Sequence, residues 1–295
     1  MPRLDALLQT ARLAADAAAA VHRRDATRVR TAVATEKGRA DYVSRTDLDA
    51  QEAALAVIRG RHPDHHVLAE ESDEPVAAQL AGWDGRPMWI VDPLDGTTNY
   101  LHGHPAYASS VAVWVDGEPA AGVVASGSSG ERWWASRRGG TFRNGVAVRV
   151  SEPGPFDRAL VGTGFPFKRL ELLPRYLGQF ERVLRSAAGI RRAGSAALDL
   201  AYLAQGSFDA FWEEVLMPWD FAAGVLLIRE AGGVVEGPGG RPLRLEESAV
   251  RAANGAATME ALREALGDGE FQREDRGPGD APARPGTREP GATND

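Results

Sequence analysis

The chain contains an apolar run that ends in an acidic turn, Trp89-Ile90-Val91-Asp92-Pro93-Leu94-Asp95-Gly96-Thr97-Thr98-Asn99. In a straight strand, Asp92 and Asp95 would point to opposite faces, because side chains alternate along the strand. Pro93 restricts φ, and Gly96 permits dihedral angles that other residues avoid. We therefore expect the backbone to bend here, so that the two carboxylates converge.

The converging groups have the chemistry of a metal site. The same bend would aim the backbone carbonyl of Leu94 at the point where Asp92 and Asp95 meet. Two carboxylates and a carbonyl oxygen form a hard, all-oxygen ligand set that suits Mg²⁺. Residues 96–98 then supply backbone N–H groups that could hold a phosphate. Taken alone, the stretch is equally consistent with an Asp-rich turn in which one aspartate is a cap.

Three further acidic residues stand at the ends of predicted elements. Glu70, in the sequence Glu70-Glu71-Ser72, follows an apolar run and could lie at the same sheet edge. Asp220 opens a predicted helix, and Thr46 or Asp47 begins another. Taken singly, each has an ordinary explanation, because solvated acidic pairs and helix N-caps are common.

The composition excludes several classes of protein. The 295 residues carry a formal net charge of −7 and no basic stripe, which argues against nucleic-acid or anionic-membrane binding. Without cysteine, the chain has no disulfide, thiolate nucleophile or Cys-ligated zinc. Residues 1–21 are Ala-rich with interspersed charges, a pattern that predicts an amphipathic helix rather than a signal peptide or a membrane span. We expect a cytoplasmic protein.

The order of the predicted elements indicates layered α/β structure. Helical patterns over residues 1–21 and 47–59 precede a series of strands between residues 107 and 145, with a hairpin turn at Asp116-Gly117. In the second half, helices alternate with mixed strands. Such an alternation implies stacked α and β layers.

The C-terminal composition sets the expected domain boundary. Residues 268–295 contain one aromatic residue, Phe271, and no aliphatic residue larger than Ala, so they cannot bury enough apolar surface to fold. We therefore expect a disordered tail after a single domain, residues 1–267. This domain would have an N-terminal lobe of about 1–150 and a C-terminal lobe of about 151–267.

Lysine is nearly absent from the chain, which has only Lys37 and Lys168. A GC-rich genome explains this preference for arginine. Lys37 nevertheless lies beside Gly38 in a polar segment, residues 35–45, that we expect to be turn-like. A compact point charge at this position could serve a site in a way that arginine does not.

Taken together, these segments resemble the inositol monophosphatase family, the Mg²⁺-dependent, lithium-sensitive phosphatases. The matching pieces run in order along the chain: Lys37-Gly38, Asp41, Thr46-Asp47, Glu70-Glu71-Ser72, residues 89–99, Gly194-Ser195-Ala196-Ala197, residues 218–224 and Glu230-Ala231-Gly232-Gly233. A D-P-x-D-G-T segment with an upstream E-E-S and a downstream W-D is a highly specific combination. The resemblance implies an α-β-α-β-α sandwich and a homodimer.

The resemblance also implies a metal-ligand set of two to three Mg²⁺ ions. Glu70, Asp92 and the Leu94 carbonyl would hold one ion. Asp92, Asp95 and Asp220 would hold a second, and a third, weaker ion would lie near Glu70. Two closely spaced metals can stabilise both the attacking and the leaving oxygen of an in-line displacement.

The same resemblance assigns catalytic roles to side chains around the metals. Asp47 would hydrogen-bond Thr97, and Thr97 together with Glu70 would orient the attacking water. Lys37 would lie near the site. The phosphate would rest on the backbone N–H groups of Gly96 and Thr97.

The implied substrate contacts are Asp95, Gly96, Thr97, Gly194, Ser195, Ala196, Glu213 and Asp220. Of these, Glu213 bears most on substrate choice, because it matches the carboxylate that hydrogen-bonds substrate hydroxyls in inositol phosphatases. Alternatively, Glu213 is only a charged residue at the end of a strand and does not contact the substrate.

The leading functional hypothesis is hydrolysis of inositol 1-phosphate or a related small polyol phosphate by metal-activated water. Histidinol-phosphate phosphatase and fructose-1,6-bisphosphatase activities are the enzymatic alternatives. A third hypothesis belongs to another class, since some bacterial relatives serve as partners of the transcription machinery. Beyond that alternative, we expect a small phosphorylated substrate and neither a nucleic-acid nor a membrane partner.

Overall fold

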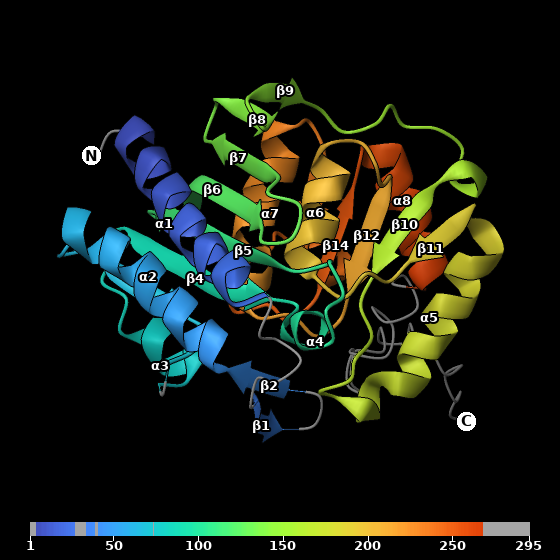
Figure 1. The fold of residues 1–295 in the computed structure, drawn as a ribbon. Helices are drawn as coiled ribbons and strands as arrows, with labels where there is room; N and C mark the ends of the chain where they lie inside the picture. Colours follow the sequence, from blue (N-terminus) through green and yellow to red (C-terminus); the bar gives the residue numbers. More distant parts are fainter. Residues whose placement is uncertain (1–3, 27–33, 39–40, 73, 268–295) are drawn as a thin grey trace, which may run out of the picture.

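The computed structural model describes residues 4–26, 34–38, 41–72 and 74–267. The predicted tail, residues 268–295, lies outside these residues. The first helix is confirmed as α1, Leu4–Asp25, whose buried side is mostly Leu and Ala. It packs along α2, Arg45–Arg61, and the two helices together cover one face of the larger sheet (Figure 1).

The larger sheet has seven strands in sequential order and contains the predicted antiparallel series. Only β3 and β4 pair in parallel, whereas each later neighbour is antiparallel. Its strands are β3 His66–Ala69, β4 Met88–Asp95, β5 Ala108–Val115, β6 Glu118–Ser126, β7 Arg132–Ser136, β8 Gly140–Arg143 and β9 Val146–Val148.

The smaller sheet has five strands in the order β11-β10-β12-β14-β13, with β10 parallel to both β11 and β12. Its strands are β10 Leu160–Thr163, β11 Gly189–Arg191, β12 Ala210–Glu213, β13 Val234–Glu236 and β14 Val250–Ala253. Between the two sheets lie α6, Ala196–Ala204, and α7, Pro218–Glu230. On the outer side lie α5, Leu173–Ser186, and α8, Ala256–Leu266.

These elements form five layers, which confirms the predicted α-β-α-β-α sandwich (Figure 1). The central helices are apolar on nearly every side, since they bury side chains against both sheets. A helix with this pattern must lie inside a protein rather than on its surface. No helix in the described parts of the chain is long and apolar enough to cross a membrane.

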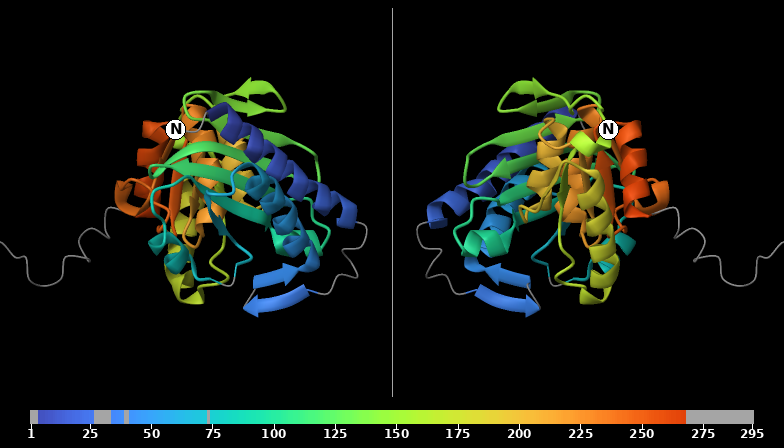
Figure 2. Two further views of the ribbon diagram at one scale, coloured as in Figure 1. Left: turned by 90° about the vertical axis from the view of Figure 1, so that its left-hand side faces the viewer. Right: turned by 90° about the vertical axis from the view of Figure 1, so that its right-hand side faces the viewer.

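The polar segment 35–45 differs from the expected turn. It forms a two-stranded antiparallel ribbon, β1 Ala34–Gly38 and β2 Asp41–Ser44, that projects beside α2 (Figure 2). The two strands pair with each other and not with either large sheet, so they require no apolar alternation. The remaining short elements are α3 Val76–Ala81, α4 Thr97–Leu101, and the 3₁₀ turns Phe156–Arg158, Leu170–Leu172 and Pro238–Gly240.

A buried ion pair links the smaller sheet to α5. The Arg251 guanidinium donates to Glu214 Oε1 at 2.7 Å, with the two side chains only 0% and 6% exposed. The Gln179 amide donates to the same oxygen at 2.8 Å, and the Arg175 guanidinium lies 3.8 Å from it. The Glu214 carboxylate is therefore held by donors from both β14 and α5.

Replacing Arg251 with Met should lower the free energy of unfolding by about 3 kcal/mol, the low end of the usual loss for a broken buried ion pair, because the remaining donors still compensate the carboxylate in part. Chemical denaturation measures the loss. The double variant Arg251→Met/Glu214→Leu is the matched control and should recover most of the stability, since it removes both charges. Equal stability of wild type and the single variant would contradict this account of the pair.

Candidate active site

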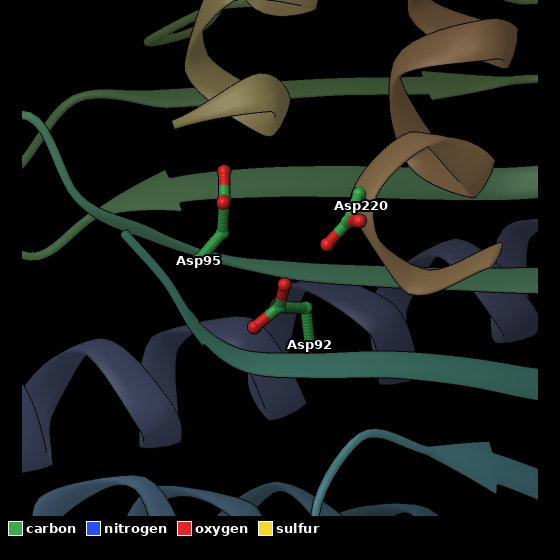
Figure 3. A group of neighbouring side chains, drawn as sticks. All are labelled: Asp92, Asp95 and Asp220. Atoms are coloured by element: carbon green, nitrogen blue, oxygen red, sulfur yellow. The ribbon is translucent and has the colours of Figure 1, made fainter. Parts of the chain in front are cut away.

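The acidic turn bends where the sequence predicted a bend. Asp92 pairs with Ser110 of β5, but Asp95 pairs with Ala108, so the β4–β5 register shifts between them. An extra residue in one strand of this kind forms a bulge and re-aims the neighbouring side chains. One carboxylate oxygen from each of Asp92, Asp95 and Asp220 consequently lies within 4.8 Å of the other two (Figure 3).

Gly96 allows the chain to turn directly from β4 into α4. Its φ is +91°, in the left-handed region, and a Cβ there would lie 2.8 Å from the Ala106 carbonyl oxygen. Any other side chain would therefore be both strained and obstructed. Gly96 and Thr97 line the same cavity as the three aspartates.

Asp95 has a second, structural role that the sequence did not indicate. It accepts hydrogen bonds from Ser195 Oγ at 2.5 Å and from the Ala197 N–H at 2.8 Å. Ser195 is itself the N-cap of α6. The predicted substrate residues 194–196 are thus held against the acidic turn by Asp95.

The other two aspartates are anchored by backbone donors. Asp92 Oδ1 accepts from the Leu94 N–H at 2.9 Å, and Asp220 Oδ2 accepts from the Met217 N–H at 2.7 Å. The sequence suggested that Asp220 begins α7 and could be its N-cap. The N-cap is instead Met217, and Asp220 is the third residue of the helix. Such anchoring fixes the orientation of each carboxylate.

The electrostatics of the cluster favour a bound cation. Burial, followed by the charges of Glu70, Asp95 and Asp220, raises the pKa of Asp92 well above its ordinary range. Burial and the charge of Asp220 raise the pKa of Asp95 to about 7. Carboxylates this close repel one another unless a positive charge neutralises them. An all-oxygen donor set with such repulsion fits a hard divalent cation.

Asp47, Thr97 and Glu70 come together beside this cluster. Thr97 Oγ1 lies 2.9 Å from Asp47 Oδ1 and 3.0 Å from the Leu94 carbonyl oxygen, and it can donate to either. Asp47 is fully buried, and burial raises its pKa although hydrogen bonds from Ser44 and Thr97 oppose the shift. Glu70 follows β3, lines the cavity and hydrogen-bonds Asp92.

The start of α2 corrects one expectation from the sequence. Its N-cap is Ser44, and neither Thr46 nor Asp47 holds that position. Asp47 instead accepts from the Ser44 N–H at 2.8 Å and from Ser44 Oγ at 2.5 Å. Asp47, the third residue of α2, thus completes the capping box with Ser44 and also contacts Thr97.

The cavity has a volume of about 400 Å³ and extends from the aspartates to β10 and β12. Gly194, Ser195, Ala196 and Glu213, which the family resemblance implies as substrate contacts, all line it. The Glu213 carboxylate lies over Gly164, where an added Cβ would come within 1.9 Å of Glu213 Oε1.

Several lining residues were missed by the sequence analysis: His102, Phe165, Phe167, Lys168, Arg192 and Asp199. Asp199 had a readable signal, because it is the single acid in the otherwise apolar helix α6. The others stand in polar or turn-rich surroundings and carry no local pattern. The side chain of Lys37 lies outside the described part of the structure, and its role stays a prediction.

The layered fold and a partly buried carboxylate cluster beside a glycine turn fit a metal-dependent hydrolase of phosphoric monoesters. The sequence profile of the inositol monophosphatase family matches residues 3–269. This chain belongs to the inositol monophosphatase family.

Two similar relatives carry different names. The chain is 46% identical to an inositol-1-monophosphatase of Rhizobium meliloti over 210 residues, which are 70% of this chain and 77% of the relative. It is 42% identical to the Nus factor SuhB of Pseudomonas aeruginosa over 221 residues, which are 74% and 80% of the two chains.

Solved structures of the family have the same fold. The suhB protein of Bartonella henselae has a TM-score of 0.80 at 37% identity, covering 89% of this chain and 97% of that one. An inositol monophosphatase of Anabaena has a TM-score of 0.77 at 34% identity, with coverages of 89% and 96%.

Proposed function

We propose that this protein hydrolyses inositol 1-phosphate, or a related small polyol phosphate, with two to three Mg²⁺ ions in the acidic cavity. The observation that carries the proposal is the convergence of Asp92, Asp95 and Asp220 within 4.8 Å, next to Glu70 and the Thr97–Asp47 pair. When bound, the ions would polarise the phosphoryl oxygens and lower the pKa of water.

The ligands divide between two positions. Glu70, Asp92 and the Leu94 carbonyl would hold one ion, and Asp92, Asp95 and Asp220 a second. A weaker third ion would lie beside Glu70. Asp92, which would contact both ions, is the most enclosed of the three aspartates, at 1% exposure, and has acidic neighbours on several sides.

Thr97 would orient the attacking water through its hydroxyl oxygen, because its single proton is used on the protein side. The Asp47 carboxylate at 2.9 Å and the Leu94 carbonyl at 3.0 Å can both only accept, so the proton is committed to one of them. Toward the cavity, the Thr97 oxygen can then only accept a hydrogen bond, in this case from water. Glu70 would accept the second proton of the same water, and the backbone N–H groups of Gly96 and Thr97 would hold the phosphate.

Activity should require Mg²⁺, fall at high Ca²⁺ and be inhibited by Li⁺. Mg²⁺ requires tight octahedral geometry, whereas Ca²⁺ takes longer bonds and more ligands, so it would alter the position of the attacking water. Steady-state rates on inositol 1-phosphate, histidinol phosphate and fructose 1,6-bisphosphate, with each ion titrated, test the reaction and its substrate. Full activity in excess chelator would exclude the metal requirement.

Glu213 is the proposed determinant of substrate choice. Replacing it with Leu should lower kcat/KM for inositol 1-phosphate about ten- to a hundred-fold, because a hydrogen bond to a substrate hydroxyl is lost. Hydrolysis of p-nitrophenyl phosphate, which has no such hydroxyl, should change little. Gly164→Ala should shift the ratio of the two kcat/KM values in the same direction, since its methyl group would displace the carboxylate. An unchanged ratio in both variants would remove the reason to prefer a polyol.

A second role is the alternative that the similarity to Nus factor SuhB proteins favours. Association with the transcription machinery would be tested by binding of the purified protein to a reconstituted transcription complex.

We also propose that the protein is a cytoplasmic homodimer. Sedimentation analysis would test the oligomeric state.

A further inference from the structure

His22 lies at the end of α1, directly beneath the bend of β4. Its side chain is fully buried, and its Nε2 lies 2.7 Å from the Pro93 carbonyl oxygen. A carbonyl oxygen can only accept, so Nε2 carries the hydrogen and donates it. The first helix is thereby connected to the residue between Asp92 and Leu94.

The surroundings hold the imidazole ring in one orientation. The rings of Tyr100 and Tyr107 pack against it at centroid distances of 6.1 and 5.8 Å. On another side, a Cβ at Gly127 would lie 2.6 Å from His22 Nδ1. A side chain at position 127 would therefore occupy the space of the His22 ring.

The protonation state of the ring follows from its burial. Burial lowers the pKa of His22 to about 4. The hydrogen bond to Pro93 raises this pKa in part, and the smaller effects of Arg23 and Asp25 have opposite signs. The ring is therefore neutral at neutral pH. Within the described residues, Nδ1 has no hydrogen-bond partner, which agrees with a neutral ring whose single N–H is committed to Pro93.

The Pro93 carbonyl lies where the ladder between β4 and β5 is irregular. The register shift between Asp92 and Asp95 interrupts the β4–β5 ladder at this residue, and Pro93 itself has no N–H to pair. The peptide group that contains the Pro93 carbonyl also contains the Leu94 N–H, which donates to Asp92 Oδ1 at 2.9 Å. Rotation of this peptide plane would therefore disturb the Asp92 carboxylate on one side and the Leu94 carbonyl on the other.

We propose that His22 is a positioning residue for the metal centre, which holds the Pro93 carbonyl and thereby orients the Asp92 carboxylate and the Leu94 carbonyl. This inference rests on the proposed metal-dependent function. His22 touches neither substrate nor metal in this assignment. It acts through the peptide group between two ligands.

The experiment compares His22→Gln with His22→Phe. Gln places an amide N–H where Nε2 lies, whereas Phe keeps a ring of similar size and has no donor. Binding of Mn²⁺ to the metal-free proteins, measured by electron paramagnetic resonance, gives a readout that is independent of turnover. Removing partners that orient metal ligands typically weakens affinity 10- to 100-fold, so we expect at least about a ten-fold loss for Phe and less than about three-fold for Gln.

Kinetics separate positioning from general damage. In His22→Phe, the Mg²⁺ concentration for half-maximal rate should rise about as much as the Mn²⁺ affinity falls, while KM for substrate at saturating Mg²⁺ stays unchanged. If the Phe variant does not fold, His22→Asn replaces it, because its shorter amide cannot reach the Pro93 carbonyl.

The possible outcomes are distinct. Wild-type Mn²⁺ affinity in the donor-less variant would overturn the proposal, and so would equal weakening in the Gln and donor-less variants. Absence of Mn²⁺ binding by the wild type would instead overturn the proposed function.

Discussion

Replacing Asp92 with asparagine should reduce turnover by at least about 1,000-fold without unfolding the protein. Asp92 is the shared ligand of the proposed ions, and metal catalysis contributes several kcal/mol of transition-state stabilisation, with each 1.36 kcal/mol a factor of ten. The amide keeps the shape of the side chain and can still accept the 2.9 Å hydrogen bond from the Leu94 N–H. Loss of activity would then reflect loss of charge.

The same substitution should stabilise the metal-free protein. Burial and three acidic neighbours raise the pKa of Asp92, so the folded state keeps a proton there that the unfolded chain loses above a pKa of about 3.9. A group that binds more protons when folded loses stability as pH rises. The melting temperature of metal-free Asp92→Asn should therefore exceed that of the wild type by a margin that grows with pH above about 4.

Thermal melts with chelator and with Mg²⁺ test both statements. Added Mg²⁺ should raise the melting temperature of the wild type and leave that of Asp92→Asn nearly unchanged. A variant that retains a large Mg²⁺-induced shift, or near-normal turnover, would contradict the assignment of Asp92 as a ligand.

Asp47→Asn should lower kcat by roughly 100- to 1,000-fold while metal binding is retained, a size typical of lost proton-transfer groups. The carboxylate accepts from Ser44 at one oxygen and from Thr97 at the other. An amide has only one accepting oxygen. If its NH₂ group faces Thr97, the direction of that hydrogen bond reverses. The Thr97 proton, no longer held by residue 47, can then point into the cavity and compete with the hydrogen bond from water.

Ser44→Ala is the matched control for this prediction. It removes the Ser44 Oγ hydrogen bond to Asp47 and leaves the contact with Thr97 intact. Both variants weaken the start of α2 by about 1 kcal/mol, the usual effect of a lost cap, but only Asp47→Asn should lose turnover. Equal kcat values in the two variants would show that Asp47 acts on the helix alone.

The local sequence was sufficient for the features that depend on adjacent residues. Apolar residues before Asp92, with Pro93 and Gly96 after it, predicted the bend because these residue types restrict the backbone directly. The periodic pattern of α1 was readable for the same reason. The family resemblance supplied the five layers and the proposed ligand set, which periodicity alone left open.

Tertiary structure alone decided which distant groups meet. Nothing near Asp95 in the chain indicates that it anchors Ser195, and the apolar run of α1 does not show that His22 faces the Pro93 carbonyl. The sequence around Arg251 or Glu214 likewise does not indicate that these two residues form an ion pair. Such contacts depend on how helices and sheets stack, so local residues set the shape of the acidic turn, and the packing of remote layers determines what holds it in place.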